Sequence, residues 1–406
     1  MLSRRSHAPR LLLLGAVALL LLTALPSHLA GAARPNGTSP AAALRPPGSA
    51  ADWLPGHVIV KMRGAAAPVM QSAGPDVAAT VAALRADPAV EYAEPDYLVH
   101  EDLVPNDEKY SDIEWWLSAM QMQAAWDVST GDPNLIMAVL DTGVAADHPE
   151  FEGRMLPGHN FVADNGNTYD DNGHGTHVSG IAGAAGNNGI GIAGVSWQHK
   201  ILPVKVLNAE GQGSTYAFAA GIRWAADNGA RVINISAGAD FSTEAEHDAI
   251  KYAKAKGVVI VVAAGNTPDG RPRYPAGYDE VIAVSASSRR DSVAGFSSYG
   301  DYVDVAAPGI NILSTFVTNR KTGYESESGT SMASPMVAGA AALVLAVNPG
   351  LSPEQVQLVL EQTADDIGDP GFDQKAGFGR INVLRALQQA PAGPQPGGGR
   401  PTPGPV

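Results

Sequence analysis

Apolar runs of strand length alternate with amphipathic segments through the middle of the chain. The apolar runs occupy residues 135–140, 200–207, 231–236, 258–265 and 280–286. Segments with helical spacing of apolar side chains occupy residues 174–183, 215–229, 243–257 and 351–364, and another begins near residue 331. Strands that are apolar on both faces, with helices between them, indicate a parallel sheet covered on both sides. The pattern predicts a three-layer α/β/α sandwich with a mainly parallel central sheet.

A smaller group of elements precedes this alternation. Residues 57–62 and 90–99 have the composition of strands, and residues 77–85 have the spacing of a short helix. They predict a small α+β segment. Two strands and one helix bury too little apolar surface to fold independently.

The N-terminus has the three parts of a secretory signal peptide, predicted at residues 1–32. Three arginines precede residue 11, an apolar run follows to residue 25, and Ala30, Gly31 and Ala32 form a small-residue cleavage pattern. A retained signal anchor is the alternative, but the apolar run is short for a membrane span. We therefore expect export to the extracellular medium.

Two further segments cannot form a core. Residues 33–54 are predicted to be a linker rich in Pro, Ala and Gly, and residues 390–406 a disordered Pro/Gly-rich tail. No apolar run long enough for a membrane anchor precedes the tail. We expect no membrane anchor.

Composition narrows the classes of function. The 406 residues include no cysteine, which excludes disulfides, thiolate nucleophiles and thiolate metal sites. The formal net charge of −14 argues against a nucleic-acid partner and suits a soluble enzyme that binds cations.

A serine at the start of a small-residue helix is the candidate nucleophile. Ser331 belongs to the string GTSMASPMVAG at residues 329–339. The first-turn N–H groups of a helix have no intrahelical partner, and its dipole favours negative charge. Ser331 could equally be an ordinary helix cap.

Three other residues at the ends of elements supply what such a serine needs. Asp141 ends a buried strand, His174 opens a helix, and Asn266 ends the third apolar strand after Asp141. Sites in parallel α/β sheets form beyond the carboxyl ends of the strands. A carboxylate can orient an imidazole base, and an amide can stabilise an oxyanion. Taken alone, Asn266 after a glycine is more typical of a turn.

The order Asp, His, Ser, with these surrounding motifs, resembles the subtilisin-like serine proteases, or subtilases, over about residues 106–389. Residues 105–110 are similar to thermitase-like members. The resemblance implies a catalytic domain at residues 105–389 that hydrolyses peptide bonds of proteins through an acyl-enzyme. In it, His174 would take the proton of Ser331, Asp141 would orient His174, and Asn266 would bind the oxyanion.

The same resemblance implies that residues 55–104 are a propeptide. It would fold beside the catalytic domain and bind it as a partner, so that the protein is made as a zymogen. This segment is shorter than is usual in the family. We expect proteolytic processing between residues 97 and 104.

Residues 184–192 resemble the calcium loop of subtilases. The implied structural Ca²⁺ site would be an oxygen cage. Its ligands would be carbonyls of Gly186, Ile190 and Ile192, the side chain of Asn188, and the carboxylates of Asp107 and Glu150. Glu150 stands where the family usually has aspartate. For each residue alone, a solvated loop position is the alternative.

A second calcium site is one interpretation of the loop at residues 163–173. Its candidate ligands are Asp164, Asn165, Asn167 and Asp170. The alternative is an ordinary turn-rich loop of the same composition.

Two glycine-containing segments match the edges that hold an extended peptide in subtilases. These are Gly211, Gln212 and Gly213, and Ser236, Ala237 and Gly238. Arg273 falls where the family has the floor of the pocket for the side chain preceding the scissile bond. The alternative is an arginine that points to solvent.

Two other sequence motifs do not indicate the sites that they superficially match. The string GIGIAG at residues 189–194 precedes a strand instead of following one, which excludes a dinucleotide site. His174 and His177 lack the further ligands of a zinc site, so His177 is expected to be structural. A catalytically silent binding protein of this fold and a dedicated processing protease for one partner remain as alternative functions. We expect a monomer.

Overall fold

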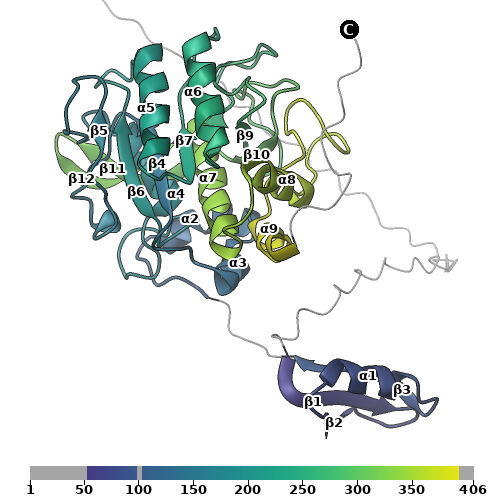
Figure 1. The fold of residues 1–406 in the computed structure, drawn as a ribbon. Coiled ribbons are helices and arrows are strands. Elements are labelled where there is room, and N and C mark those ends of the chain that lie inside the picture. Colours follow the sequence, from purple (N-terminus) through teal and green to yellow (C-terminus); the bar gives the residue numbers. More distant parts are fainter. Residues whose placement is uncertain (1–52, 98–102, 393–406) are drawn as a thin grey trace, which may run out of the picture. The chain divides into compact units, whose positions relative to one another are not determined.

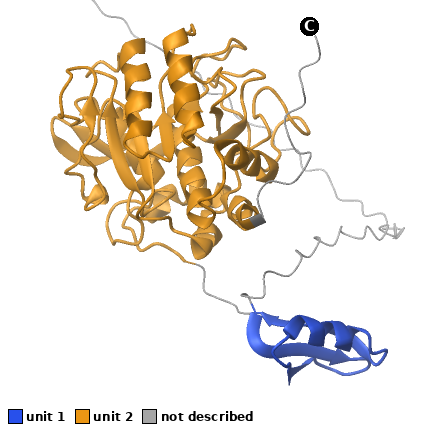
Figure 2. Ribbon diagram, viewed as in Figure 1, with its two compact units in different colours: residues 1–100 blue, residues 101–406 orange. Residues whose placement is uncertain are grey.

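The computed structural model describes residues 53–97 and 103–392. Two compact units are present, formed by residues 1–100 and 101–406 (Figure 2). The predicted signal peptide, nearly all of the predicted linker and part of the predicted processing region lie outside the described residues.

The first unit is a three-stranded antiparallel sheet with one helix. Strand β1 (Trp53–Met62) pairs with β2 (Val69–Ser72) on one side and β3 (Val90–Tyr97) on the other. Helix α1 (Val77–Arg85) begins where the Asp76 side chain accepts a hydrogen bond from the N–H group of Ala79 at 2.8 Å.

The apolar side chains of this unit form a small core. Val58 and Val60 from β1 pack with Val77 and Val81 from α1. The sequence did not predict β2, because all four of its side chains are exposed and none adds to the core. With this third strand, the unit is larger than the two strands and one helix that were expected.

The second unit is built on a seven-stranded sheet in the order β10-β9-β8-β7-β4-β6-β5, and every neighbouring pair runs parallel (Figure 1). Its strands are β4 (Ile136–Asp141), β5 (His159–Asn160), β6 (Lys200–Lys205), β7 (Val232–Ile235), β8 (Val259–Ala263), β9 (Ile282–Ser287) and β10 (Val305–Pro308).

Helices cover both faces of this sheet, and the side chains of β4 show why. Met137 and Val139 join the core on one face, whereas Ala138 and Leu140 join the core on the other. Helices α5 (Thr215–Asp227) and α6 (Glu244–Ala255) cover the second face. The first face is covered by α2 (Tyr110–Ala119), α3 (Met122–Val128), α4 (His174–Gly183), α7 (Thr330–Val347), α8 (Pro353–Thr363) and α9 (Val383–Gln389). The predicted three-layer α/β/α architecture is confirmed.

A hairpin that the sequence analysis did not predict leads into helix α7. Strand β11 (Ile312–Thr318) pairs with β12 (Lys321–Glu327). The turn residues Asn319 and Arg320 both have positive φ, 51° and 60°, as a two-residue turn of this handedness requires. The hairpin ends four residues before Ser331.

The ordered chain continues beyond the predicted start of the tail. Ala390 is fully buried, and its carbonyl accepts a hydrogen bond from Nδ2 of Asn348 at 3.0 Å. Residues 390–392 form a 3-10 turn. The predicted boundary at residue 390 is therefore too early.

One helix among the described residues, α7, is long and apolar enough to cross a membrane. Most of it, 83%, is buried inside the second unit. This apolar helix is thus part of the protein core.

Candidate active site

The first pair of predicted site residues meets at the carboxyl edge of the sheet. Strand β4 ends at Asp141, and helix α4 begins at His174. Nδ1 of His174 lies 2.8 Å from Oδ1 of Asp141, whose side chain is fully buried. The same oxygen accepts the N–H group of Thr142 at 2.7 Å. A buried carboxylate held in this way fixes the orientation of the imidazole.

A glycine makes this approach of strand and helix possible. A Cβ atom at Gly175 would lie 2.1 Å from the carbonyl oxygen of Gly143 and 3.2 Å from Oδ1 of Asp141. Any side chain at this position would push α4 away from β4. The glycine that follows His174 is therefore required by packing.

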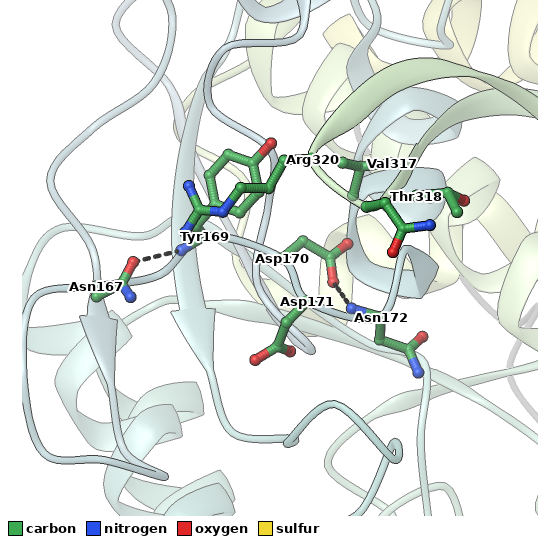
Figure 3. A pocket seen from close by; sticks show the side chains of 9 residues that line it. Asn167, Tyr169, Asp170, Asp171, Asn172, Val317, Thr318 and Arg320 are labelled. Carbon is green, nitrogen blue, oxygen red and sulfur yellow. Dashed lines mark hydrogen bonds between the residues drawn. The ribbon is translucent and has the colours of Figure 1, made fainter.

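Asp170 anchors the start of helix α4. Its Oδ1 accepts hydrogen bonds from Thr142 Oγ1 and from the N–H groups of Asn172 and Gly173, and its Oδ2 accepts two from Thr176. Figure 3 shows this carboxylate turned toward the backbone of Asn172. Five donors satisfy the carboxylate without a cation. Asp170 is thus a positioning residue for α4 and not a free ligand of a second calcium site.

The other proposed ligands in this loop do not form a cage with Asp170. Asp164 is exposed, and its Oδ1 pairs with Nε2 of His159 at 3.2 Å. The side-chain oxygens of Asn165 and Asn167 accept N–H groups two residues further on, as in ordinary Asx turns. The geometry gives the loop the turn-rich role that was the alternative.

Ser331 lies in the first turn of α7. Its hydroxyl donates a hydrogen bond to the carbonyl of Ser236 at 3.1 Å. The Ser236 hydroxyl donates to the carbonyl of Ser331 at 3.0 Å and accepts from Nδ2 of Asn234 at 3.0 Å. Oδ1 of Asn234 accepts from the buried hydroxyl of Ser334. This chain of bonds ties the first turn of α7 to the end of β7.

Asn266 is held by the residue beside the serine. Its Oδ1 accepts hydrogen bonds from the N–H group and hydroxyl of Thr330, at 2.9 and 3.0 Å. Because the oxygen is engaged, Nδ2 is the group left to donate. This nitrogen lies only 3.3 Å from where a Cβ of Gly329 would be. The missing side chain at Gly329 keeps the amide accessible.

A cavity of about 220 Å³ opens beside Ser331 and Asn266. Arg273 lies in its wall, and only 16% of its side chain is exposed. The guanidinium forms an ion pair with Asp240, while its buried Nε has no hydrogen-bond partner among the described residues. The structure therefore places Arg273 at the cavity instead of in solvent.

The two predicted peptide-binding edges lie around a second cavity of about 270 Å³. Gly211, Gln212 and Gly213 contribute one side of its lining. Ala237 and Gly238 line both this cavity and the one beside Ser331. The two edges are thus neighbours in space, although they are far apart in sequence.

The electrostatic surroundings of His174 include a residue that sequence analysis did not identify. Burial disfavours the imidazolium, but the adjacent Asp141, and to a lesser extent Glu327 and Asp170, stabilise it and raise the pKa of His174 above its usual value. Burial also raises the pKa of Glu327. Glu327 is the last residue of β12, a strand that no sequence pattern predicted.

His177 has the structural role that was expected. Its Nε2 lies 3.0 Å from the carbonyl oxygen of Glu325 in β12. Burial lowers the pKa of His177 to about 4, which keeps the ring neutral. This contact holds the β11–β12 hairpin against α4.

The structure brings together the residues of the first predicted calcium loop. Oδ2 of Asp107 accepts the N–H group of Asn187 at 2.8 Å, whereas its buried Oδ1 has no partner among the described residues. Both oxygens of Glu150 are bonded, one to Asn188 Nδ2 and the other to the N–H group of Ile192 and to Tyr324.

The backbone oxygens of this loop fit a cation better than its carboxylates do. Among the described residues, no hydrogen bond reaches the carbonyls of Gly186, Ile190 or Ile192. No group of three or more His, Cys, Asp or Glu side chains suited to a metal occurs among those residues either. The free carbonyls and Oδ1 of Asp107 could hold a hard cation such as Ca²⁺, whereas Glu150 would have to exchange a bond to do so.

Comparison with known proteins agrees with the fold. The subtilase family matches residues 132–379, more than half of the chain. The chain is 44% identical over 312 residues to the thermophilic serine proteinase of Bacillus sp. (strain AK1), which covers 77% of this chain and 76% of that protein. It is 42% identical over 284 residues to thermitase of Thermoactinomyces vulgaris, which covers 70% of this chain and 99% of that protein.

A solved structure of a protease from Pseudoalteromonas arctica is also similar, with a TM-score of 0.66 and 30% identity over 71% of this chain and all of that one. The site and these relatives define a serine endopeptidase. The chain belongs to the subtilase family, and within that family it is thermitase-like.

Replacing Glu327 with glutamine should lower the pKa of His174 by roughly half a unit. The change removes a negative charge that favours the imidazolium, so the neutral ring should form at lower pH. NMR titration of the His174 imidazole, in a Ser331→Ala background that avoids self-digestion, measures the shift. Glu325→Gln, at an exposed position on the same strand, is the control. An unchanged pKa in Glu327→Gln would contradict the assignment.

Proposed function

We propose that the chain is a secreted serine endopeptidase that acts through an acyl-enzyme. Asp141, His174 and Ser331 would form the triad, and Asn266 would stabilise the oxyanion. The observation that carries the proposal is the 2.8 Å bond between His174 and the buried Asp141, on an edge where Ser331 and Asn266 line one cavity. A buried acid, an oriented base, a nucleophile and an amide donor are the parts that acyl transfer requires.

In the proposed reaction, the Ser331 hydroxyl leaves the carbonyl of Ser236 and attacks the scissile carbonyl carbon. His174 accepts the hydroxyl proton as the C–O bond forms. The electron pair of the carbonyl moves to its oxygen, which would receive hydrogen bonds from Nδ2 of Asn266 and from the N–H group of Ser331. His174 then protonates the leaving amine, and a water molecule releases the acyl group by the same steps in reverse.

Peptide substrates would bind along the two backbone edges. Residues 211–213 and 236–238 flank adjoining cavities, which suits a peptide added as a strand between them. The side chain preceding the scissile bond would enter the cavity beside Arg273. Backbone binding of this kind suits broad use of protein substrates.

Two alternatives differ from this proposal in testable ways. A catalytically silent binding protein would lack at least one of the four residues, and none is missing. A dedicated processing protease for one partner would cleave few of the bonds that a degradative enzyme cleaves. We favour the broad endopeptidase, because the two edges present backbone to the substrate.

The remaining parts of the chain fit an exported zymogen. We propose residues 1–32 as the signal peptide. Because Trp53 and Leu54 belong to strand β1, the predicted linker of residues 33–54 would end at residue 52, and the propeptide would begin at residue 53 and extend to residue 104. The small core of the first unit supports a propeptide with its own fold. The catalytic domain would act as a monomer after processing between residues 97 and 104.

We propose that Ca²⁺ stabilises the loop of residues 184–192. The support is the contact of Asp107 with Asn187 of this loop, together with the buried Oδ1 of Asp107 and three loop carbonyls that have no hydrogen-bond partner among the described residues. The chain has no cysteine, so no disulfide can restrain this loop. A bound cation would restrain it by holding its oxygen ligands together. Glu150 already accepts three hydrogen bonds within the protein, so it is the member of the proposed ligand set that is least available to a cation.

Ser331→Ala should keep the fold and abolish proteolysis, because no other group is positioned to form the acyl-enzyme. The expected loss in kcat is about a millionfold, the size known for the nucleophile of a subtilisin. Casein hydrolysis and labelling by a fluorophosphonate probe measure it. Ser328→Ala, at an exposed serine three residues earlier, should retain activity. Full activity in Ser331→Ala would disprove the proposed nucleophile.

Removing calcium should lower Tm, because the cation binds only the folded loop. A ligand present at a hundred times its Kd stabilises the fold by about 2.7 kcal/mol. Calorimetry of the Ser331→Ala protein with and without excess chelator is the measurement. Asp107→Asn should shrink the chelator-dependent shift, whereas Asp164→Asn should not alter it. A Tm that chelator leaves unmoved would exclude the calcium site.

Arg273→Gly should shift cleavage toward Phe and Leu at the position preceding the scissile bond. The change enlarges the cavity and removes a cation that pairs with carboxylates. Cleavage profiling of a peptide library by both proteins is the test. Arg271→Gly, whose side chain is 74% exposed, is the matched control. Identical profiles would mean that Arg273 does not contact the substrate.

A further inference from the structure

The second cavity contains a carboxylate that none of the roles above uses. Glu246 lines this cavity together with apolar side chains that include Phe218, Phe241 and Tyr274. Only 6% of Glu246 is exposed. A buried carboxylate in a largely apolar wall is costly unless a positive charge or hydrogen-bond donors face it.

A helix-capping role does not account for this glutamate. Glu246 is the third residue of α6, and its N–H group donates to the Thr243 hydroxyl at 3.3 Å. In a capping box, the glutamate side chain would in turn accept the N–H group of Thr243. Here that N–H group donates to the Tyr278 hydroxyl at 3.1 Å. The Tyr278 hydroxyl thus takes the bond that a capping box would give to Glu246, and it is itself a hydrogen-bond partner of the Glu246 side chain.

Within the part of the chain that the structure describes, no basic side chain pairs with Glu246. Among the described residues, no ion pair includes it. The adjacent His247 pairs with Glu280 at 2.9 Å, and Arg273 pairs with Asp240. Both of these basic side chains therefore already have acidic partners.

The position of the cavity relative to Ser331 indicates which part of a substrate it would meet. It shares Ala237 and Gly238 with the cavity beside Ser331, and its lining does not include His174. Because His174 would protonate the leaving amine, the Glu246 cavity belongs to the acyl side of the scissile bond. An extended peptide spans such adjoining cavities within a few residues.

We propose that Glu246 determines specificity by accepting the cationic end of a Lys or Arg side chain on the acyl side of the scissile bond. The inference rests on the proposed endopeptidase function. The long methylene stem of such a side chain would pack against Phe218, Phe241 and Tyr274, and its charge would reach the carboxylate. The cavity would then select an amphipathic, basic residue where an apolar cavity would select Leu or Phe.

The preference should depend on pH. Burial raises the pKa of Glu246 to about 7, so the carboxylate is mostly charged at pH 8.5 and mostly neutral at pH 6. The other titratable groups around it are Tyr278, which hydrogen-bonds its side chain, and Tyr274 in the cavity lining. His247 stacks on Tyr278, with ring centroids 4.2 Å apart. A His247→Gln variant separates the contribution of that imidazole and should keep the pH dependence.

Peptides with a fixed residue before the scissile bond, and Lys, Arg, Gln or Leu at each earlier position, provide the test. The full chain should cleave the Lys or Arg peptides about tenfold faster, by kcat/KM, than the Gln peptides at one position. Glu246→Gln should remove this preference. Glu246→Leu should favour Leu there, and Glu244→Gln, an exposed glutamate of the same helix, should behave as the parent.

The outcomes separate the two proposals. Cleavage without any basic preference, or the same preference in Glu246→Gln, would overturn the role of Glu246 alone. Absence of cleavage of every peptide would overturn the proposed endopeptidase function and this inference with it. A preference that disappears between pH 8.5 and pH 6 in the parent and in His247→Gln supports the carboxylate as the group responsible.

Discussion

The close packing of helices α4 and α7 is the constraint on which the site depends. A Cβ atom at Gly339 of α7 would lie 2.9 Å from the carbonyl oxygen of Ala182 in α4 and 2.6 Å from Cβ of Val195. On another side of α4, a Cβ atom at Gly180 would lie 2.2 Å from the hydroxyl oxygen of Thr315 in β11. Only glycine permits these contacts. With the two helices held this close on one face of the parallel sheet, their N-termini carry the imidazole and the serine to the same edge.

Local charge is arranged around this frame by buried carboxylates with different tasks. Asp141 holds the imidazole, and Asp170 satisfies the open N–H groups at the start of α4. Glu327 contributes charge from the neighbouring hairpin without a bond to the ring. The same hairpin is fixed to α4 through His177, so packing and electrostatics are coupled at this point.

Each of the two cavities near the candidate site contains one mostly buried charged side chain. Two cavities adjoin along the backbone of residues 237–238, as a strand-like peptide requires. Arg273, paired with Asp240, lies in one, and Glu246, without a basic partner, lies in the other. Each charge is buried enough to discriminate between side chains, because water screens it poorly there.

The sequence by itself determined the layers of the catalytic unit and the four residues of the candidate site, since apolar periodicity and motifs at strand and helix ends are local signals. The tertiary structure alone decided the role of Asp170, whose carboxylate accepts five hydrogen bonds from four residues. It alone also decided the nearness of Glu327 to His174. It also decided that Glu246 lines a cavity. At its position in the helix, Glu246 would be expected to accept the N–H group of Thr243, but that group donates to Tyr278, 32 positions later in the sequence. Such choices depend on side-chain directions and on partners remote in sequence, which no local pattern encodes.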